Sequence, residues 1–162
     1  MLSTQNLSAN IDGIIDKINS INSLEFNFEQ RTNGINENGK CLLKFPAKLK
    51  CDYTDVKQKE LIINNKTLAV IQKKYNKVYY YPLSRSSFSQ ILKKDKLIQF
   101  IRSSDKRFIN DEIHLINKDK DNQKISIIFD KKSFDLIGWK INDKFNNDII
   151  FLIEIISTNK LF

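Results

Sequence analysis

The stretch Leu42-Leu43-Lys44-Phe45-Pro46-Ala47-Lys48-Leu49-Lys50-Cys51-Asp52-Tyr53 decides the fold of this chain. It contains two strand-like runs, 40–44 and 49–53, on either side of a short connection that contains Pro46. So short a connection cannot hold the crossover that parallel strands need, and the two runs therefore predict an antiparallel hairpin. In the second run apolar and polar residues alternate, which predicts a strand with one buried face.

The pattern of this hairpin continues on both sides. Upstream, Leu24, Phe26 and Phe28 alternate with polar residues, which predicts a strand. Asn33-Gly34 and Asn38-Gly39 are turn dipeptides, predicted to end this strand and to start the next. Downstream, further strand-like runs cover residues 61–64, 67–73, 77–81, 112–117, 124–129, 136–141 and 148–157. We expect an antiparallel meander of nine or so strands that curls on itself and so hides its edges.

Two segments have the apolar spacing of amphipathic helices. In the first, apolar residues recur every three or four positions, which predicts a helix from about Thr4 to Ile21 with Ser3 as its cap. In the second, Ser87-x-x-Gln90 fits a capping box, and the helical spacing gives an apolar face made of Phe88, Ile91, Leu92, Leu97, Phe100 and Ile101. This second helix fits two interpretations, a lid over the concave face of the sheet or an ordinary part of the core.

The composition indicates a globular protein with one domain, residues 1–162, because 41% of the residues are hydrophobic and 28% are charged. The apolar runs are too short to cross a bilayer. A net charge of +8 could suggest nucleic acid, but the lysines are scattered among turn-like residues and arginine is scarce. We expect no nucleic-acid partner.

Nothing in the sequence points to catalysis. The chain has one histidine, His114, without a nucleophile motif beside it, and there is no Gly-rich phosphate loop. The two cysteines, Cys41 and Cys51, have no companion His or Cys cluster for a metal ion. We therefore expect no enzymatic activity, no metal and no cofactor.

The two cysteines lie equally far from the centre of the predicted hairpin. They can therefore face each other across the two strands, close enough for a disulfide if they form a close pair. Free Cys is commonly an ordinary core residue, and two buried thiols are the favoured alternative.

An ordered set of motifs resembles the LolA-type outer-membrane lipoprotein carriers. These motifs are Phe26-x-Phe28-x-Gln30, the stretch quoted above, and Ile62-Ile63-Asn64-Asn65-Lys66-Thr67-Leu68. The resemblance extends over most of residues 7–155. It implies a mainly β (α+β) fold, in which an incomplete antiparallel β-barrel with a helical lid and an N-terminal helix encloses an apolar cavity.

The resemblance also implies a function, that of a periplasmic chaperone that carries acylated lipoproteins from the inner to the outer membrane. The implied partners are those lipoproteins, an inner-membrane lipoprotein-releasing ABC complex and an outer-membrane acceptor where one exists, and we expect a monomer. Two alternatives stay open, a soluble carrier of another lipid or amphiphile and a basic scaffold or nucleic-acid-binding module.

Residues for the lipid-binding cavity follow from strand alternation and from the lid face. They are Phe26, Phe28, Leu49, Cys51, Tyr53, Ile71, Phe88, Ile91, Leu92, Leu136 and Trp139. Family members usually carry an Arg before the Pro of the hairpin, which holds the lid, whereas this chain has Phe45 there. The resemblance therefore implies a weaker polar latch at Phe45.

The chain as given has no export signal at its start. The resemblance favours a mature periplasmic chain whose signal has been removed, over a cytosolic protein. Family members usually continue through another strand and a Pro-containing tail, whereas this chain stops at Phe162. Both a naturally short protein and a fragment are consistent with that end.

Overall fold

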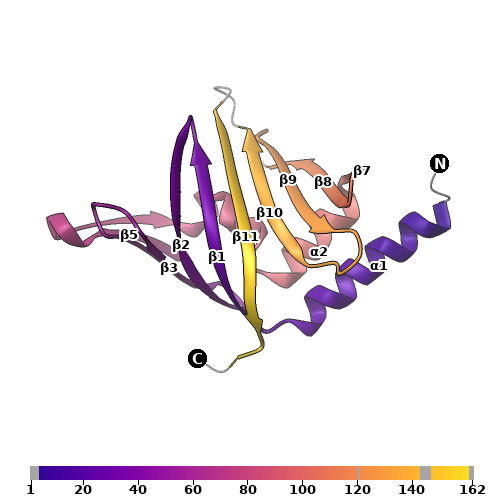
Figure 1. Ribbon diagram of the computed structural model, residues 1–162, viewed down its shortest axis with the longest axis horizontal. Coiled ribbons are helices and arrows are strands. Elements are labelled where there is room, and N and C mark those ends of the chain that lie inside the picture. Colours follow the sequence, from indigo (N-terminus) through magenta and orange to yellow (C-terminus); the bar gives the residue numbers. More distant parts are fainter. Residues whose placement is uncertain (1–3, 120, 143–146, 161–162) are drawn as a thin grey trace.

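The computed structural model describes residues 4–119, 121–142 and 147–160, and for residues 4–9, 87 and 88 it describes the backbone alone. These residues form one sheet and two α-helices (Figure 1). The helices are α1 (Thr4–Ser20) and α2 (Lys94–Ser103), with short 3₁₀ helices η1 (Lys73–Tyr75), η2 (Leu83–Arg85) and η3 (Ser87–Gln90). The strands are β1 (Ser23–Thr32), β2 (Ile35–Lys44), β3 (Lys48–Tyr53), β4 (Lys59–Asn64), β5 (Thr67–Gln72), β6 (Lys77–Pro82), β7 (Asp105–Ile109), β8 (Glu112–Lys118), β9 (Lys124–Asp130), β10 (Leu136–Asn142) and β11 (Asp148–Thr158).

All neighbouring strands of the sheet are antiparallel, in the order β6-β5-β4-β3-β2-β1-β11-β10-β9-β8-β7. The sheet consists of two meanders, β1–β6 and β7–β11. They are joined by the pairing of β1 with β11, which runs from Leu24 opposite Thr158 to Thr32 opposite Ile149. The predicted incomplete antiparallel barrel is therefore confirmed. The expectation that the sheet hides its edges was wrong, because β6 and β7 remain as its two edges.

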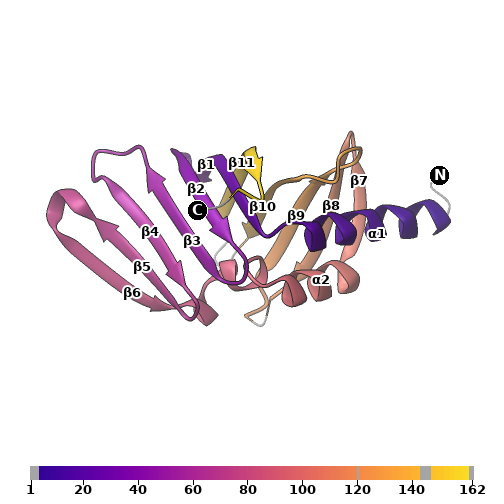
Figure 2. The same ribbon diagram turned by 90° about the horizontal axis from the view of Figure 1, so that it is seen from below.

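Both α-helices lie against one half of the sheet. In Figure 2, α1 and α2 run side by side beneath the half that contains β7–β10, whereas β4, β5 and β6 extend beyond them. The apolar stripe of α1 is buried at Ile11, Ile14, Ile15 and Ile18, and that of α2 at Leu97, Phe100 and Ile101. We call the face of the sheet that these helices cover the inner face.

The dipeptide Asn38-Gly39 is not a turn, contrary to the prediction, but lies within β2. Gly39 pairs with Phe28 on one side and with Tyr53 on the other. A Cβ atom at this position would clash with the carbonyl oxygen of Asp52 and would lie 2.7 Å from the Phe28 ring. The glycine is needed for this close approach inside the sheet, and the turn signal of the dipeptide was misleading.

The second helix does not begin at Ser87, so the predicted capping box was wrong. Residues Ser87–Gln90 form η3, and α2 begins only at Lys94, after Lys93, whose side chain makes no capping hydrogen bond. The carbonyl oxygen of Leu92 accepts a hydrogen bond from the amide of Ala47 (2.8 Å), which ties this part of the segment to the β2–β3 turn. A tertiary contact therefore overrides the local helix signal. Strand β7, which follows α2, was missed because it is short and only half-buried.

Cys41 and Cys51 face each other in β2 and β3 and form a disulfide. The favoured expectation of two free thiols was wrong. The equal distance of the two residues from the turn was the correct signal, because it places them in direct register with Cα atoms 4.1 Å apart. Both side chains are buried, so the disulfide is also part of the core.

Candidate functional site

An aromatic row crosses the inner face at the junction of the two meanders. The rings of Trp139 and Phe151 are stacked with centroids 4.4 Å apart, and Phe151 is stacked on Phe28 at 4.8 Å. Phe28 in turn meets Tyr53 edge to face at 4.8 Å, across the space that Gly39 leaves open. The row joins four strands, β10, β11, β1 and β3, into one continuous apolar wall.

Beside this row the lid segment, residues 87–103, closes over a small apolar cavity of about 10 Å³. Its lining is entirely apolar and comprises Phe26, Cys41, Leu43, Leu49, Ile91, Leu92, Leu136, Trp139 and Phe151. Six predicted cavity residues therefore come together here: Phe26, Leu49, Ile91, Leu92, Leu136 and Trp139. A volume of this size has room for about one water molecule, so the lid is packed directly onto the wall.

The remaining predicted cavity residues divide into three groups. Phe28, Cys51 and Tyr53 are buried, with Phe28 and Tyr53 in the aromatic row and Cys51 in the disulfide. Ile71 was wrongly placed, since its register opposite Glu60 and Val78 puts it on the outer face. The inward positions of β5 are Leu68 and Val70, so the alternation was read one residue out of phase. The side chain of Phe88 lies outside the described residues.

The β2–β3 turn holds the lid segment by two contacts. One is the hydrogen bond from the Ala47 amide to the Leu92 carbonyl oxygen. The other is a cation–π contact, in which the Lys94 ammonium lies 5.5 Å from the centroid of the Phe45 ring. The latch position therefore carries an aromatic ring that faces a lysine of α2.

Sequence reasoning missed the part of the inner face that no helix covers. Register places the buried side chains of Leu61, Ile63 and Leu68 beside the cavity wall. The less covered positions are Val70, Tyr79 and Tyr81, which continue this face to the edge strand β6. The two tyrosines are 42% and 49% exposed. The run Val78-Tyr79-Tyr80-Tyr81 places large side chains on both faces of β6, so the sequence pattern alone did not distinguish the inner face.

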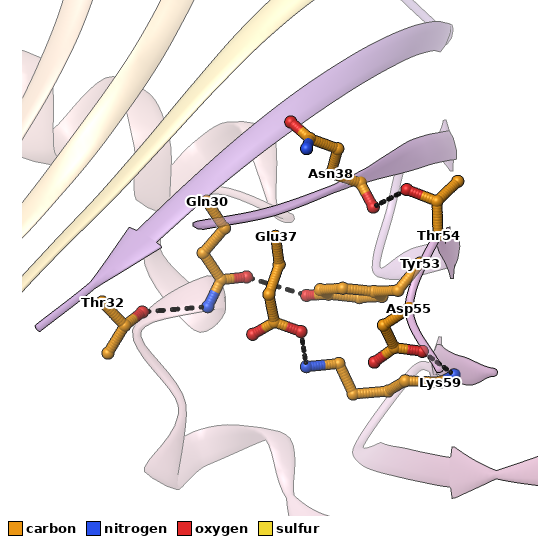
Figure 3. Close-up of polar contacts among 8 residues, drawn as sticks. All are labelled: Gln30, Thr32, Glu37, Asn38, Tyr53, Thr54, Asp55 and Lys59. Atoms are coloured by element: carbon orange, nitrogen blue, oxygen red, sulfur yellow. Dashed lines mark hydrogen bonds and ion pairs between the residues drawn. The ribbon is translucent and has the colours of Figure 1, made fainter. Parts of the chain in front are cut away.

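A polar cluster forms the rim of the inner face at the ends of β1 and β3 (Figure 3). The Tyr53 hydroxyl donates a hydrogen bond to the Gln30 side-chain oxygen (2.9 Å), and the Lys59 ammonium pairs with Glu37 while lying 4.1 Å from the Tyr53 ring centroid. Burial raises the pKa of Tyr53, and the carboxylates of Glu37 and Asp55 raise it further. The Tyr53 side chain is therefore a neutral phenol at physiological pH. Its hydroxyl group lies at the edge of the apolar wall, where it bonds to Gln30.

The described residues contain no group of three or more His, Cys, Asp or Glu side chains placed to hold a metal ion. Among the helices of this part of the chain, none is long and apolar enough to cross a membrane.

Solved structures with this fold are only distantly related in sequence. An uncharacterized conserved protein from Thermus thermophilus matches with a TM-score of 0.58 and 8% identity, over 96% of this chain and 90% of that one. MucB matches with a TM-score of 0.52 and 9% identity, over 98% of this chain and 62% of MucB. A LolA superfamily protein from Nitrosomonas europaea matches with a TM-score of 0.49 and 11% identity, over 94% and 95% of the two chains. No curated protein matches the sequence.

The family model described as "Outer membrane lipoprotein carrier protein LolA" matches residues 19–162. This match includes every strand of the sheet, the lid segment and the β2–β3 turn. It leaves out only most of α1. The chain therefore belongs to the LolA family of outer-membrane lipoprotein carrier proteins.

Proposed function

We propose that this protein is a periplasmic carrier that binds the acyl chains of lipoproteins against its inner face and takes them from the inner to the outer membrane. The single observation that carries this proposal is the apolar wall, which is closed by a separate segment at one end and exposed at Tyr79 and Tyr81 at the other. Membership of the LolA family supports the same role.

Acyl chains supply the free energy for such binding. Each methylene group buried from water contributes about 0.8 kcal/mol, so a lipoprotein with several chains needs a large apolar container to stay in solution. The closed cavity of about 10 Å³ is far too small for even one chain. In this proposal the lid segment moves away from the wall, and the acyl chains replace Ile91 and Leu92 against Phe26, Leu49 and Trp139.

The proposed partners are an inner-membrane ABC complex that releases lipoproteins and, where one exists, an outer-membrane acceptor. In this proposal the carrier works as a monomer without a cofactor, and the cargo enters and leaves by exchange between apolar surfaces. A direct test is to mix the purified protein with a triacylated lipoprotein and with the same lipoprotein lacking its acyl chains, and to follow both by size-exclusion chromatography. We expect a soluble complex with the acylated form alone. Equal binding of the two forms would contradict acyl recognition.

The position of the cargo can be tested with Trp139, the single tryptophan of the chain. Bromine atoms quench tryptophan fluorescence at contact, so 9,10-dibromostearic acid should quench Trp139 and plain stearic acid should not. Displacement of the brominated acid by the acylated lipoprotein would place both ligands in one site. If another amphiphile displaces the brominated acid and the acylated lipoprotein does not, the protein is a carrier of a different lipid.

A further inference from the structure

Two connections at one end of the sheet carry exposed apolar side chains, each next to a lysine in the sequence. They are residues 54–58, between β3 and β4, and residues 73–77, which include η1 and lead into β6. We call them together the basic tip. Val56 is 76% exposed, the highest value among the large hydrophobic residues described, and Tyr75 is 50% exposed. The basic tip lies at the end of the long axis opposite α1 (Figures 1 and 2).

The base of the tip is held by hydrogen bonds that leave its apex outside. The Thr54 amide and hydroxyl both donate to the Asn38 carbonyl oxygen, and the Lys59 amide donates to the Asp55 carboxylate (Figure 3). The two connections are tied together by the amides of Lys73 and Lys74, which donate to the carbonyl oxygens of Gln58 and Lys57. The loop is therefore anchored in a form that presents Val56 to solvent.

The charge around these apolar side chains is positive. The basic tip contains four lysines, Lys57, Lys73, Lys74 and Lys77, and one carboxylate, Asp55. Lys73 pairs with Glu60 at 2.6 Å, whereas Lys57, Lys74 and Lys77 form no ion pair with another described residue. Three lysines without a carboxylate partner in the described part of the chain therefore belong to the same two connections as Val56 and Tyr75, and the Lys74 ammonium lies 5.8 Å from the centroid of the Tyr75 ring.

We propose that the basic tip docks the protein reversibly on a membrane surface rich in anionic phospholipid. A lysine near such a surface contributes to binding through the negative surface potential, and an apolar or aromatic side chain between lysines enters the headgroup region. The tip presents two exposed large apolar side chains, which suits insertion between headgroups better than the broad contact of a stable protein interface. This docking concerns a surface separate from the inner face and does not depend on the cargo.

The test is co-sedimentation of the full chain with sucrose-loaded vesicles of phosphatidylcholine alone or of phosphatidylcholine with phosphatidylglycerol at 3:1. We expect binding to the anionic vesicles that weakens as salt is added, since the charges are exposed. The double variant Val56→Ser/Tyr75→Ser and the triple variant Lys57→Ser/Lys74→Ser/Lys77→Ser should each bind at least about tenfold more weakly.

Matched controls carry the same changes elsewhere on the surface. Ile35→Ser/Ile109→Ser removes two residues that are 68% and 45% exposed, and Lys96→Ser/Lys118→Ser/Lys132→Ser removes the same charge. Both controls should bind vesicles like the unchanged protein, and the tip variants should still show quenching of Trp139 by dibromostearic acid. Failure of the unchanged protein to bind anionic vesicles would overturn the proposal, and so would an equal loss in the controls. If the protein does not bind vesicles but binds an acidic partner protein through the tip lysines, the tip is a protein-docking surface instead.

Discussion

The backbone amide of Ala47 donates a hydrogen bond to the carbonyl oxygen of Leu92 (2.8 Å), which ties the β2–β3 turn to the segment that leads into α2. This bond involves only backbone atoms, so it does not depend on the residue at the latch position. The side-chain part of the latch is the contact between Phe45 and Lys94. Of these two contacts between the turn and the lid segment, a side-chain substitution at Phe45 removes only the second.

The first prediction concerns this side-chain contact. Phe45→Ala should speed the exchange of dibromostearic acid about two- to fivefold, because an exposed cation–π contact contributes about 0.5–1 kcal/mol to the closed state. Stopped-flow fluorescence of Trp139 measures the exchange rate. Phe108→Ala is a control for the loss of a phenylalanine ring beside a lysine, since Phe108 on β7 lies 5.9 Å from the Lys131 ammonium and has no place in the β2–β3 turn. Equal acceleration by both variants would mean that the effect is not specific to the latch.

The second prediction concerns the uncovered part of the inner face. Tyr79→Ser/Tyr81→Ser should weaken the affinity for the brominated acid by about tenfold if the acyl chain extends onto β6, because apolar contact area is lost. Tyr80→Ser provides the control, since Tyr80 lies on the opposite face of the same strand. Both variants should keep the thermal midpoint of the unchanged protein. An unchanged affinity in the double variant would restrict the site to the region under the lid.

The sequence predicted the fold where two kinds of signal agreed. Strand alternation and short turns placed β3 and β5 to within one residue at each end, and the spacing of Ile11, Ile14, Ile15 and Ile18 gave the buried stripe of α1. Prediction failed where a long-range contact decided the local structure. Gly39 is a strand residue because the Phe28 ring occupies the space beside it, and no local pattern contains that information.

The candidate site was predicted in part for the same reason. Residues of β1, β3, β10 and the lid were assigned to one cavity, and six of them do meet there. It is harder to predict which residues of β5 face inward. Four of the five residues from Leu68 to Gln72 are apolar, so alternation cannot show which face is buried. The exposure of Tyr79 and Tyr81 follows from the extent of the helices, which no strand pattern predicts.

The third prediction concerns the disulfide. The double variant Cys41→Ala/Cys51→Ala should unfold with a free energy about 2–3 kcal/mol lower than that of the oxidised protein, because the bond closes a short loop in the unfolded chain. Urea denaturation with and without a reducing agent measures the difference. The reducing agent should lower the stability of the unchanged protein and leave that of the variant unaltered. The same response in both proteins would show that the reagent acts elsewhere.

The last prediction concerns Glu25, a buried carboxylate on the outer face of β1. Hydrogen bonds from the Lys40 ammonium and from the Ser157 hydroxyl hold the pKa of Glu25 below its ordinary value of 4.5, and the charge of Lys160 at 3.5 Å adds to this effect. A carboxyl group whose pKa is lower in the folded than in the unfolded chain stabilises the fold above the unfolded pKa. That contribution is lost as the pH falls through the folded pKa.

Glu25→Gln should therefore lower the thermal midpoint at pH 7, and the difference from the unchanged protein should shrink as the pH falls below 4.5. Scanning calorimetry at several values between about pH 7 and about pH 3 would measure this trend. Glu154→Gln is the matched control, because Glu154 is exposed and lies on the same face of the neighbouring strand β11. A difference between Glu25→Gln and the unchanged protein that stays constant over this range would show that shape, and not charge, makes Glu25 stabilising. If the difference in thermal midpoint disappears at low pH, the charge of Glu25 stabilises the pairing of β1 with its neighbours. Its partners Lys40 and Ser157 come from β2 and β11, the strands on either side of β1.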